Sequence, residues 1–389
     1  MWEAARRRPT PAHAATLDRP AAPWTMGAMA TRTLPAAALA LAALAASAGC
    51  DGAPVGGVEV TPGPQVPAGN PDRLCAVPPD GAAEDTSRPT TVVGDGTPRS
   101  CTPEAFEAAV ARAGIVTFDC GPDPVTITLP REVKLVNDAG AGRNGDLVID
   151  GGGKVTLSGG GAHRILYMNG CDPEQHWITD HCQDYPHPRL VVQNLTFANG
   201  RATEADRGGG AIYARSGQLK VVNSVFLGNR CAATGPDVGG GAIYAFQQAG
   251  PVLVVNSTFG APGQGNVGSN GGALGSIGVS WTVLNAVMEH NQAVGVGQNP
   301  ARAGTPGGGS GGAIYNDGNT YTLSICGSEV RDNAARELAG AVFFVSNDRS
   351  GSVVVDRSTF RANPGLDVQD LPGFFVLAGS RTVTASTVE

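Results

Sequence analysis

The sequence predicts an all-β protein whose body is a single-stranded parallel β-helix, a solenoid of stacked coils. Three observations support this prediction. Two short strand-like elements alternate along the chain with a period near 30 residues. Glycine accounts for 56 of 389 residues, roughly twice its usual share. Charged residues make up only 16% of the chain, whereas the hydrophobic content is a normal 41%. This balance is typical of buried strands joined by tight turns rather than of a disordered chain.

The first repeated element is a glycine pair followed by alanine and an aliphatic residue. Its alanines are residues 211, 242, 273, 313 and 341, so successive copies are 31, 31, 40 and 28 residues apart. The longest step contains the glycine-rich segment Gly295–Gly309, which we expect to be a flexible loop at the rim of the solenoid. The copies are GGGAIYA (208–214), GGGAIYAF (239–246), GGALG (271–275), GGAIYN (311–316) and AGAVFF (339–344).

The second element is a run of β-branched and aromatic residues that contains a central asparagine in four copies. The copies span residues 190–197, 219–226, 253–259, 282–288, 324–330 and 354–360. An F-x-x-N turn follows several of them. A unit of about 30 residues cannot bury its own apolar face, so copies must stack as in a solenoid. Stacking in register predicts an amide ladder of Asn194, Asn223, Asn256 and Asn285.

A capping helix is predicted before the repeats. Thr102 is a suitable N-cap, Pro103 occupies the first turn, and Gly114 ends the amphipathic run. Such a helix covers the open end of a solenoid core. Strand-like runs follow at 115–118, 125–129, 147–149 and 154–157, and residues 374–377 are expected to belong to the last of about nine coils.

These segments resemble a known superfamily. GTPRSCTPEAFEAAVARAGIVTFDCG (96–121) and DLVIDGGGKVTLSGGG (146–161) are similar to the N-terminal cap and first coils of pectin-lyase-like proteins. The GGAI and F-x-x-N repeats resemble those of chlamydial polymorphic outer-membrane proteins, which are adhesins. The resemblance implies a single-stranded right-handed parallel β-helix with a short N-terminal capping helix. It implies little about function, because the superfamily includes lyases, hydrolases and adhesins.

The N-terminal 89 residues are predicted to lie outside the solenoid. Residues 36–48 are Ala and Leu apart from Ser47, which indicates an export signal too short to span a membrane permanently. Ser47-Ala48-Gly49-Cys50 resembles the lipobox of bacterial lipoproteins and implies lipidation of Cys50, although ordinary cleavage after Ala48 is the alternative. We therefore divide the chain into a signal peptide with a spurious extension (1–49), a flexible Pro/Gly-rich tether (50–89) and the β-helix (90–389).

Export allows the cysteines to form disulfides. The short-loop pairs Cys101 with Cys120 and Cys171 with Cys182 are the favoured bridges, and no spacing typical of zinc ligands is present. If Cys50 is lipidated, seven cysteines remain and one is left over. The net charge of −7 gives no basic stripe, so nucleic acid is not expected as a partner.

The sequence contains no recognisable pectate lyase or polygalacturonase catalytic motif. Trp177-Ile178-Thr179-Asp180-His181 differs from the pectate lyase signature by an inserted threonine. The weak catalytic candidates are Glu204, Asp206 and Asp237, which precede equivalent GGGAIY copies and would meet on adjacent coils. A Ca²⁺ cofactor is expected only if the protein is an enzyme. The alternative, non-catalytic interpretation is that these carboxylates are solvated turn residues beside Arg201 and Arg207.

A row of aromatic residues suggests binding instead. The residue after the aliphatic position of each GGAI copy should face away from the core. Tyr213, Tyr244 and Tyr315 occupy that place, while Gly275 interrupts the row. Exposed tyrosines can stack on sugar rings. Aromatic stacking that only stabilises the sheet, or coverage by loops, is the alternative.

The sequence thus favours a monomeric, exported cell-envelope lipoprotein, at the outer membrane or cell surface, or secreted if not lipidated. The predicted role is a carbohydrate-binding or adhesive surface module, with a polysaccharide or cell-surface glycan as partner. The alternatives are a polysaccharide lyase or glycoside hydrolase acting on acidic polysaccharide, and a passive structural protein.

Overall fold

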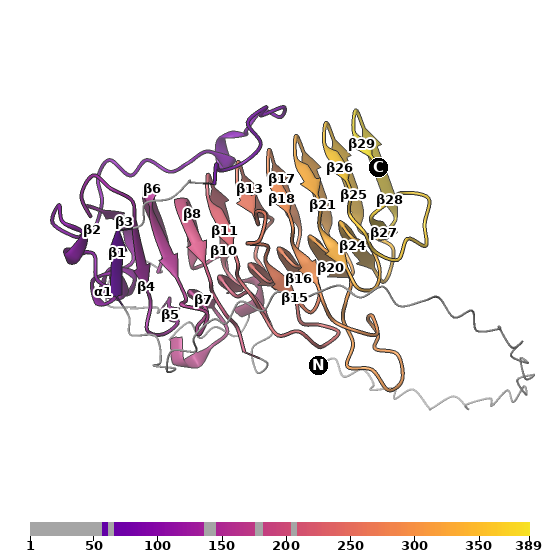
Figure 1. Ribbon diagram of the computed structural model, residues 1–389, viewed down its shortest axis with the longest axis horizontal. Coiled ribbons are helices and arrows are strands. Elements are labelled where there is room, and N and C mark those ends of the chain that lie inside the picture. Colours follow the sequence, from indigo (N-terminus) through magenta and orange to yellow (C-terminus); the bar gives the residue numbers. More distant parts are fainter. Residues whose placement is uncertain (1–56, 61–65, 136–144, 176–181, 204–207) are drawn as a thin grey trace, which may run out of the picture. The chain divides into compact units, whose positions relative to one another are not determined.

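The computed structural model describes residues 57–60, 66–135, 145–175, 182–203 and 208–389. Stacked parallel coils dominate this part of the chain, as Figure 1 shows, and confirm the predicted parallel β-helix. Each coil adds one strand to sheet B and, in most coils, two strands to sheet A. No helix within the described ranges is long and apolar enough to cross a membrane.

Sheet A is the largest sheet. It contains the strands on both sides of the turns at Asn194, Asn223, Asn256 and Asn285. Its eighteen strands are β1 (Gly57–Val60), β2 (Thr91–Val93), β3 (Gly114–Phe118), β4 (Val125–Thr128), β6 (Leu147–Ser158), β8 (Arg189–Ala198), β10 (Gln218–Val222), β11 (Val225–Leu227), β13 (Val252–Val255), β14 (Thr258–Phe259), β17 (Trp281–Leu284), β18 (Val287–Glu289), β21 (Thr322–Cys326), β22 (Glu329–Arg331), β25 (Ser352–Asp356), β26 (Thr359–Arg361), β28 (Ser380–Thr384) and β29 (Thr387–Val388). The strands paired between coils are parallel; β1 pairs antiparallel with β4.

Sheets B and C complete the coils. Sheet B consists of β5 (Val133–Lys134), β7 (Leu166–Asn169), β9 (Ile212–Arg215), β12 (Ile243–Phe246), β16 (Leu274–Ile277), β20 (Ile314–Gly318), β24 (Val342–Ser346) and β27 (Phe374–Leu377). Sheet C consists of β15 (Val267–Gly268), β19 (Gln292–Ala293) and β23 (Ala334–Ala335). The described residues therefore supply eight strands to sheet B, close to the nine or so coils predicted. β27 belongs to the stack, as predicted, because it pairs with β24.

The core is built from files of equivalent residues in successive coils. The aliphatic residues of the GGAI copies are in register, Ile212 with Ile243 and Ile243 with Leu274, and each is fully buried. Phe197, Phe226 and Phe259 stack with ring centroids 4.9 and 4.7 Å apart. Each such side chain contributes about 1.5–3 kcal/mol by burial. The repeated pattern thus produces one continuous apolar column.

The predicted capping helix is α1 (Pro103–Arg112). The Thr102 hydroxyl accepts a hydrogen bond from the Ala105 amide at 3.1 Å, which satisfies an otherwise free donor of the first turn. Phe106 is fully buried and stacks on Phe118 of β3 with centroids 5.9 Å apart. The helix therefore packs against the first coil. Within the described ranges, short 3-10 turns lie outside the sheets at η1 (Pro79–Gly81), η2 (Pro98–Ser100), η4 (Pro173–Gln175) and η5 (Cys182–Asp184).

The predicted asparagine ladder is present at the turn between the two strands of sheet A. Side-chain amide nitrogens donate from Asn223 to Asn194, from Asn256 to Asn223 and from Asn285 to Asn256, at 3.2–3.3 Å. All four residues have φ between 46° and 53°. Asparagine tolerates this left-handed conformation better than most residues, so the same side chain permits the turn and links the coils.

A second, fully buried amide ladder follows the phenylalanine file. Asn229 donates to Asn266, Asn266 to Asn291, Asn291 to Asn333 and Asn333 to Asn363, at 2.8–2.9 Å. Four of these asparagines belong to the F-x-x-N turns. Asn266 lies seven residues after Phe259, because residues 260–265 bulge outward before the chain rejoins the ladder. The F-x-x-N spacing alone therefore did not identify Asn266 as a member of this ladder.

Residues 66–89 differ from the predicted flexible tether. They form a strap that crosses the outer face of several coils, which appears in purple along the top of Figure 1. Asn70 bonds to the backbone of Asn285 and of Gly327, while the Lys220 ammonium binds Glu84 at 2.6 Å. The prediction of a flexible tether is wrong for these residues, because the groups that anchor them lie more than 100 residues away in sequence.

The strap covers an apolar stripe on the outside of sheet A. Val222, Val255 and Leu284 pack together at 2%, 1% and 7% exposure although they point away from the core. Gly81 of the strap lies against them, since a Cβ there would be 3.3 Å from Val255 Cγ2. Covering these side chains stabilises both the strap and the coils.

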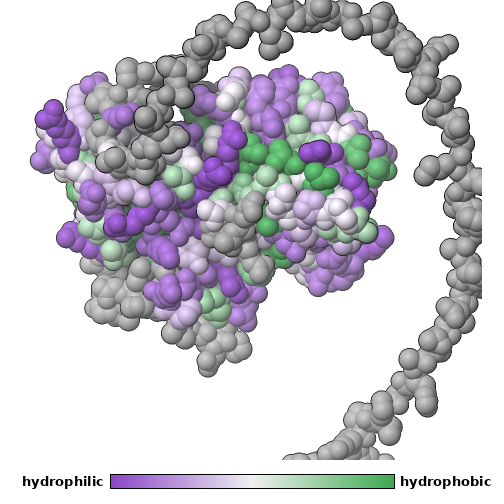
Figure 2. Space-filling model, turned by 60° about the horizontal axis from the view of Figure 1, so that its bottom comes forward, coloured by the Kyte–Doolittle hydropathy of each residue, from purple (hydrophilic) through white to green (hydrophobic). Residues whose placement is uncertain are grey.

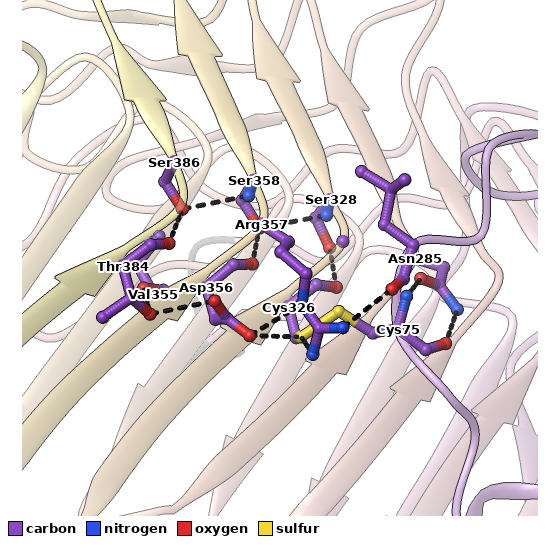
Figure 3. The surroundings of a disulfide bond; sticks show 12 residues. Cys75, Asn285, Cys326, Ser328, Val355, Asp356, Arg357, Ser358, Thr384 and Ser386 are labelled. Atoms are coloured by element: carbon purple, nitrogen blue, oxygen red, sulfur yellow. Dashed lines mark hydrogen bonds and ion pairs between the residues drawn. A yellow bond between two sulfur atoms is a disulfide. The ribbon is translucent and has the colours of Figure 1, made fainter.

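A disulfide between Cys75 and Cys326 fastens the strap to β21 across 251 residues of sequence. Figure 3 shows it beside Asn285, whose side-chain oxygen accepts a hydrogen bond from the Cys75 amide at 3.0 Å. Arg357 adds a third contact by donating to the Leu74 carbonyl. The sequence suggested no partner for either cysteine.

The other cysteines agree with the predictions where the structure describes them. Cys101 is bonded to Cys120, and Cys171 to Cys182, as the short loops suggested. Cys231 is the unpaired, buried cysteine. Cys50, with the rest of the predicted signal peptide, lies outside the described residues.

Replacing Asn291 with alanine should sharply destabilise the coils. In a fully buried position, the change removes the side-chain donor to the Phe259 carbonyl and the acceptor of the Asn266 backbone amide and of one Asn266 side-chain hydrogen. At about 1–3 kcal/mol per orphaned group, we expect at least ~3 kcal/mol loss in urea unfolding. Asn223→Gly, at a partly exposed position of the first ladder, keeps the turn conformation and should cost less than half as much. Equal losses of stability in the two variants would contradict a special role for the second, buried ladder.

Removing the strap disulfide should free the strap while leaving the coils folded. For Cys75→Ser with Cys326→Ser we expect hydrogen exchange to accelerate over residues 66–85, and stability to fall by about 2–4 kcal/mol. The Cys101→Ser, Cys120→Ser protein is the matched control, because that disulfide holds the capping region instead. Unchanged exchange in the strap would show that its other contacts suffice.

Candidate functional site

The predicted aromatic row exists but is covered. Tyr213 stacks between Tyr167 and Tyr244 with centroids 5.3 and 6.0 Å apart, and Tyr315 stacks on Phe343 at 5.0 Å. Gly275 interrupts the row, as expected, since it is in register with Tyr244 and Tyr315. Tyr213, Tyr244 and Tyr315 are only 6%, 1% and 1% exposed. The expectation of exposed tyrosines is therefore wrong, and these ring faces are not available to a sugar.

Two loops account for the coverage of Tyr244 and Tyr315. The Tyr244 hydroxyl donates to the backbone carbonyl of Asp237 at 3.0 Å, so residues 235–238 fold over its ring. The Tyr315 hydroxyl accepts from the Asn299 amide at 2.7 Å, so the 295–309 loop covers the next position. Burial raises the pKa of Tyr315 well above its usual value. The sequence could not show this, because alternation indicates only that the residues face away from the core.

The 295–309 loop is held in place rather than flexible. Both Glu337 carboxylate oxygens accept from Arg302, at 2.8 and 2.9 Å, and Oε1 also accepts from the Gly297 amide at 2.9 Å. The hydrogen bonds from Arg302 are the main reason that the pKa of Glu337 is lowered, and burial opposes them. The charged Glu337 carboxylate thus anchors the 295–309 loop through these hydrogen bonds.

Of the three predicted carboxylates, the structure places one. Glu204 and Asp206 lie outside the described residues, as does 177–181, so their proximity is untested. Asp237 is exposed and accepts from the Asn299 side-chain amide at 3.0 Å. The same nitrogen lies 2.9 Å from Asp317 Oδ2. One amide therefore bridges two carboxylates that are 80 residues apart in sequence.

Asp317 is a titratable residue that the sequence analysis missed. Burial is the main cause of its raised pKa, and the nearby charge of Asp237 adds to it. The amide of Gly318 and the side chain of Asn347 oppose the rise by donating hydrogen bonds. A carboxyl with a raised pKa beside a second carboxyl group is an arrangement suited to proton transfer. Its position two residues after Tyr315 was the only sequence signal.

A groove of about 780 Å³ lies over sheet C and the turns that precede it in earlier coils. Its volume falls within the range of about 300–1,000 Å³ usual for ligand sites. Figure 2 turns forward the side that carries β7, β15 and β16, and shows a band of hydrophobic residues between hydrophilic ones. The groove has polar and apolar walls, with Arg201, Arg230, His290 and Gln292 among its lining residues.

The two arginines of the groove are in register on neighbouring coils. Arg201 pairs with Arg230, and Arg230 pairs in turn with Val267 of β15, which pairs with Gln292 of β19. Coil spacing puts successive backbones about 4.8 Å apart. Arg201 and Arg230 are exposed, and no hydrogen bond or ion pair of their side chains occurs among the described residues.

Such a pair of like charges is unfavourable unless an anion compensates it. Guanidinium groups bind carboxylates and phosphates in a planar, bidentate manner. Cys231 also lines the groove, but burial raises the pKa of its thiol to about 12, so it is not a nucleophile at neutral pH. The groove is therefore equipped to bind an anionic group.

Acid should release the 295–309 loop. Because the pKa of Glu337 is lowered in the folded chain, its contribution is complete above the usual carboxyl pKa and is lost as pH falls through the lowered value. We expect loop hydrogen exchange, corrected for intrinsic rates, to accelerate as the pH falls below the usual range of a glutamate carboxyl. Glu337→Gln should produce the same effect at pH 7, together with faster trypsin cleavage at Arg302. Glu107→Gln, which breaks the exposed pair with Arg131, should leave the loop unchanged.

Comparison of the chain with protein-family models, with curated proteins and with solved structures found no match. The functional argument therefore rests on the geometry of the chain itself.

Proposed function

We propose that the protein is a carbohydrate-binding module whose ligand is an acidic polysaccharide held in the groove over sheet C. The observation that carries the proposal is the in-register pair Arg201 and Arg230 without an acidic partner in the described chain. Uronic acid residues along a polysaccharide supply repeated carboxylates. A repeating ligand suits a repeating surface, because successive coils offer equivalent positions.

The groove supplies the other contacts that a sugar needs. Gln292 is exposed and offers an amide donor and acceptor, and His290 adds a ring that can donate a hydrogen bond. Val267, Ala233 and Val294 form apolar wall against which the C–H face of a sugar ring can pack. This mixture of a few charged groups, amides and apolar side chains is usual in ligand sites.

The cellular setting of the proposal follows from the N-terminal sequence. An export signal and a lipid on Cys50 would place the module on the cell envelope, where acidic glycans are available. Membership of the pectin-lyase-like superfamily belongs to the same proposal and is supported by the cap, the coils and the ladders. A lipid anchor would also compensate for weak single-site binding, because many tethered copies act together.

A hydrolase or lyase is the second candidate, favoured by the raised pKa of Asp317 beside Asp237. Its reactive groups would be reached only if the 295–309 loop moves, since this loop covers Tyr315 beside them. New reducing ends or unsaturated products from an acidic polysaccharide, abolished by Asp317→Asn, would support this candidate over simple binding.

Neutralising the groove should weaken binding to acidic glycans alone. For Arg201→Gln with Arg230→Gln we expect retention on immobilised polygalacturonate to fall about 10-fold to 100-fold at low salt, at about 1 kcal/mol or more per lost contact. Wild-type retention should itself fall as salt is raised.

The matched control is Arg88→Gln with Arg99→Gln, which removes two exposed arginines elsewhere. It should retain wild-type affinity if the groove is the site. Equal loss in both proteins would indicate a non-specific charge effect and overturn the proposal. Absence of retention on every acidic and neutral glycan tested would contradict the proposed binding function and favour a structural role.

A further inference from the structure

Three metal-ligating side chains meet at one edge of the groove. A carboxylate oxygen of Glu289, a ring nitrogen of His290 and a carboxylate oxygen of Asp332 all lie within 4.8 Å of one another. They come from two neighbouring coils, at the ends of β18 and β22. No sequence spacing indicates this set, because Asp332 is 42 residues after His290.

The coil architecture itself brings these side chains together. Glu289 is in register with Arg331, so the next residues, His290 and Asp332, occupy equivalent places one coil apart. Both have φ of 57°, and Gly228 and Ala362 have φ of 62° and 52° at the same turn of other coils. The left-handed turn is thus a property of the repeat, while the histidine and aspartate on it are particular to these two coils.

Glu289 is the most unusual member of the group. It is 6% exposed, and its Oε2 is held in an ion pair with Arg331 Nη1 at 2.5 Å. A buried carboxylate normally accepts several hydrogen bonds. The ion pair engages one lone pair of Oε2, so the other lone pair can bind a cation.

The charges around the group leave room for a cation. Arg331 pairs with Glu289, with Glu329 and, at 3.6 Å, with Asp332, and Arg361 also pairs with Glu329. With Asp332, three carboxylates face two guanidinium groups, so one negative charge remains when His290 is neutral. A divalent cation would reverse that balance to a single positive charge.

We propose that Glu289, His290 and Asp332 bind a divalent transition-metal ion of the Zn²⁺ class. A histidine nitrogen with two carboxylate oxygens suits Zn²⁺, whereas Ca²⁺ prefers oxygen ligands alone. Three protein ligands leave a fourth position open. The only other candidate cluster in the described residues, Cys75 with Cys326 and Asp356, has both sulfurs in a disulfide.

The metal site deepens the proposed function in one respect. His290 belongs both to this group and to the groove lining, so the ion lies at the edge of the groove. A carboxylate of a bound acidic sugar can then occupy the open position. This last step rests on the proposed function; the binding of the metal does not.

The test is isothermal titration of the full chain with Zn²⁺ and with Ca²⁺ after treatment with a chelator. We expect a Zn²⁺ site that is weakened at least 10-fold by His290→Ala and by Asp332→Asn. Ala362 shows that the turn accepts alanine, and circular dichroism and thermal unfolding check that both variants fold. His163→Ala, another partly exposed histidine, is the control and should bind as the wild type does.

Co²⁺ provides a second readout, because its visible spectrum reports ligation directly. Absorption bands that are present in the wild type and lost in both variants would support the site. Zn²⁺ binding that is absent, or equal in wild type and both variants, would overturn it. Glycan retention is measured separately without metal, so failure of this site and failure of the arginine groove are distinguishable.

Discussion

Stacking in register is the constraint on which the rest of this structure depends. A single coil exposes both its apolar side chains and its backbone groups, so it is stable only with a neighbour on each side. Register then decides everything that one coil places above another. Apolar residues form columns and asparagines form ladders. A charged residue that recurs at the same position of the repeat lies beside a residue of the same charge in the next coil.

The two amide ladders serve different needs. The outer ladder lies at a turn with left-handed backbone and is partly exposed at Asn194 and Asn223 but buried at Asn256 and Asn285. The inner ladder is buried throughout and donates to backbone carbonyls of neighbouring coils. A buried amide is costly unless every polar atom is bonded, so the inner ladder tolerates little change. The bulge before Asn266 shows how strongly it is specified: the chain adds residues outside the coil yet returns to the same bond.

The functional features follow from the same geometry. Arg201 and Arg230 are neighbours only because the coils stack in register, and the same is true of His290 and Asp332. The loops between strands are free to vary in length, and here they cover the tyrosine row while leaving the surface over sheet C open. Loop placement, rather than the strands, thus selects which face can meet a ligand.

The sequence by itself determined what is local or periodic: the parallel coils, the capping helix, the two short-loop disulfides and the outer ladder. Each is encoded within one repeat or a short segment, where spacing implies contact. Only the tertiary structure decided the strap, the Cys75–Cys326 bond, the Asn299 bridge and the burial of Tyr244 and Tyr315. These depend on segments distant in sequence, and the path of a loop over a sheet follows from three-dimensional packing that periodicity does not contain.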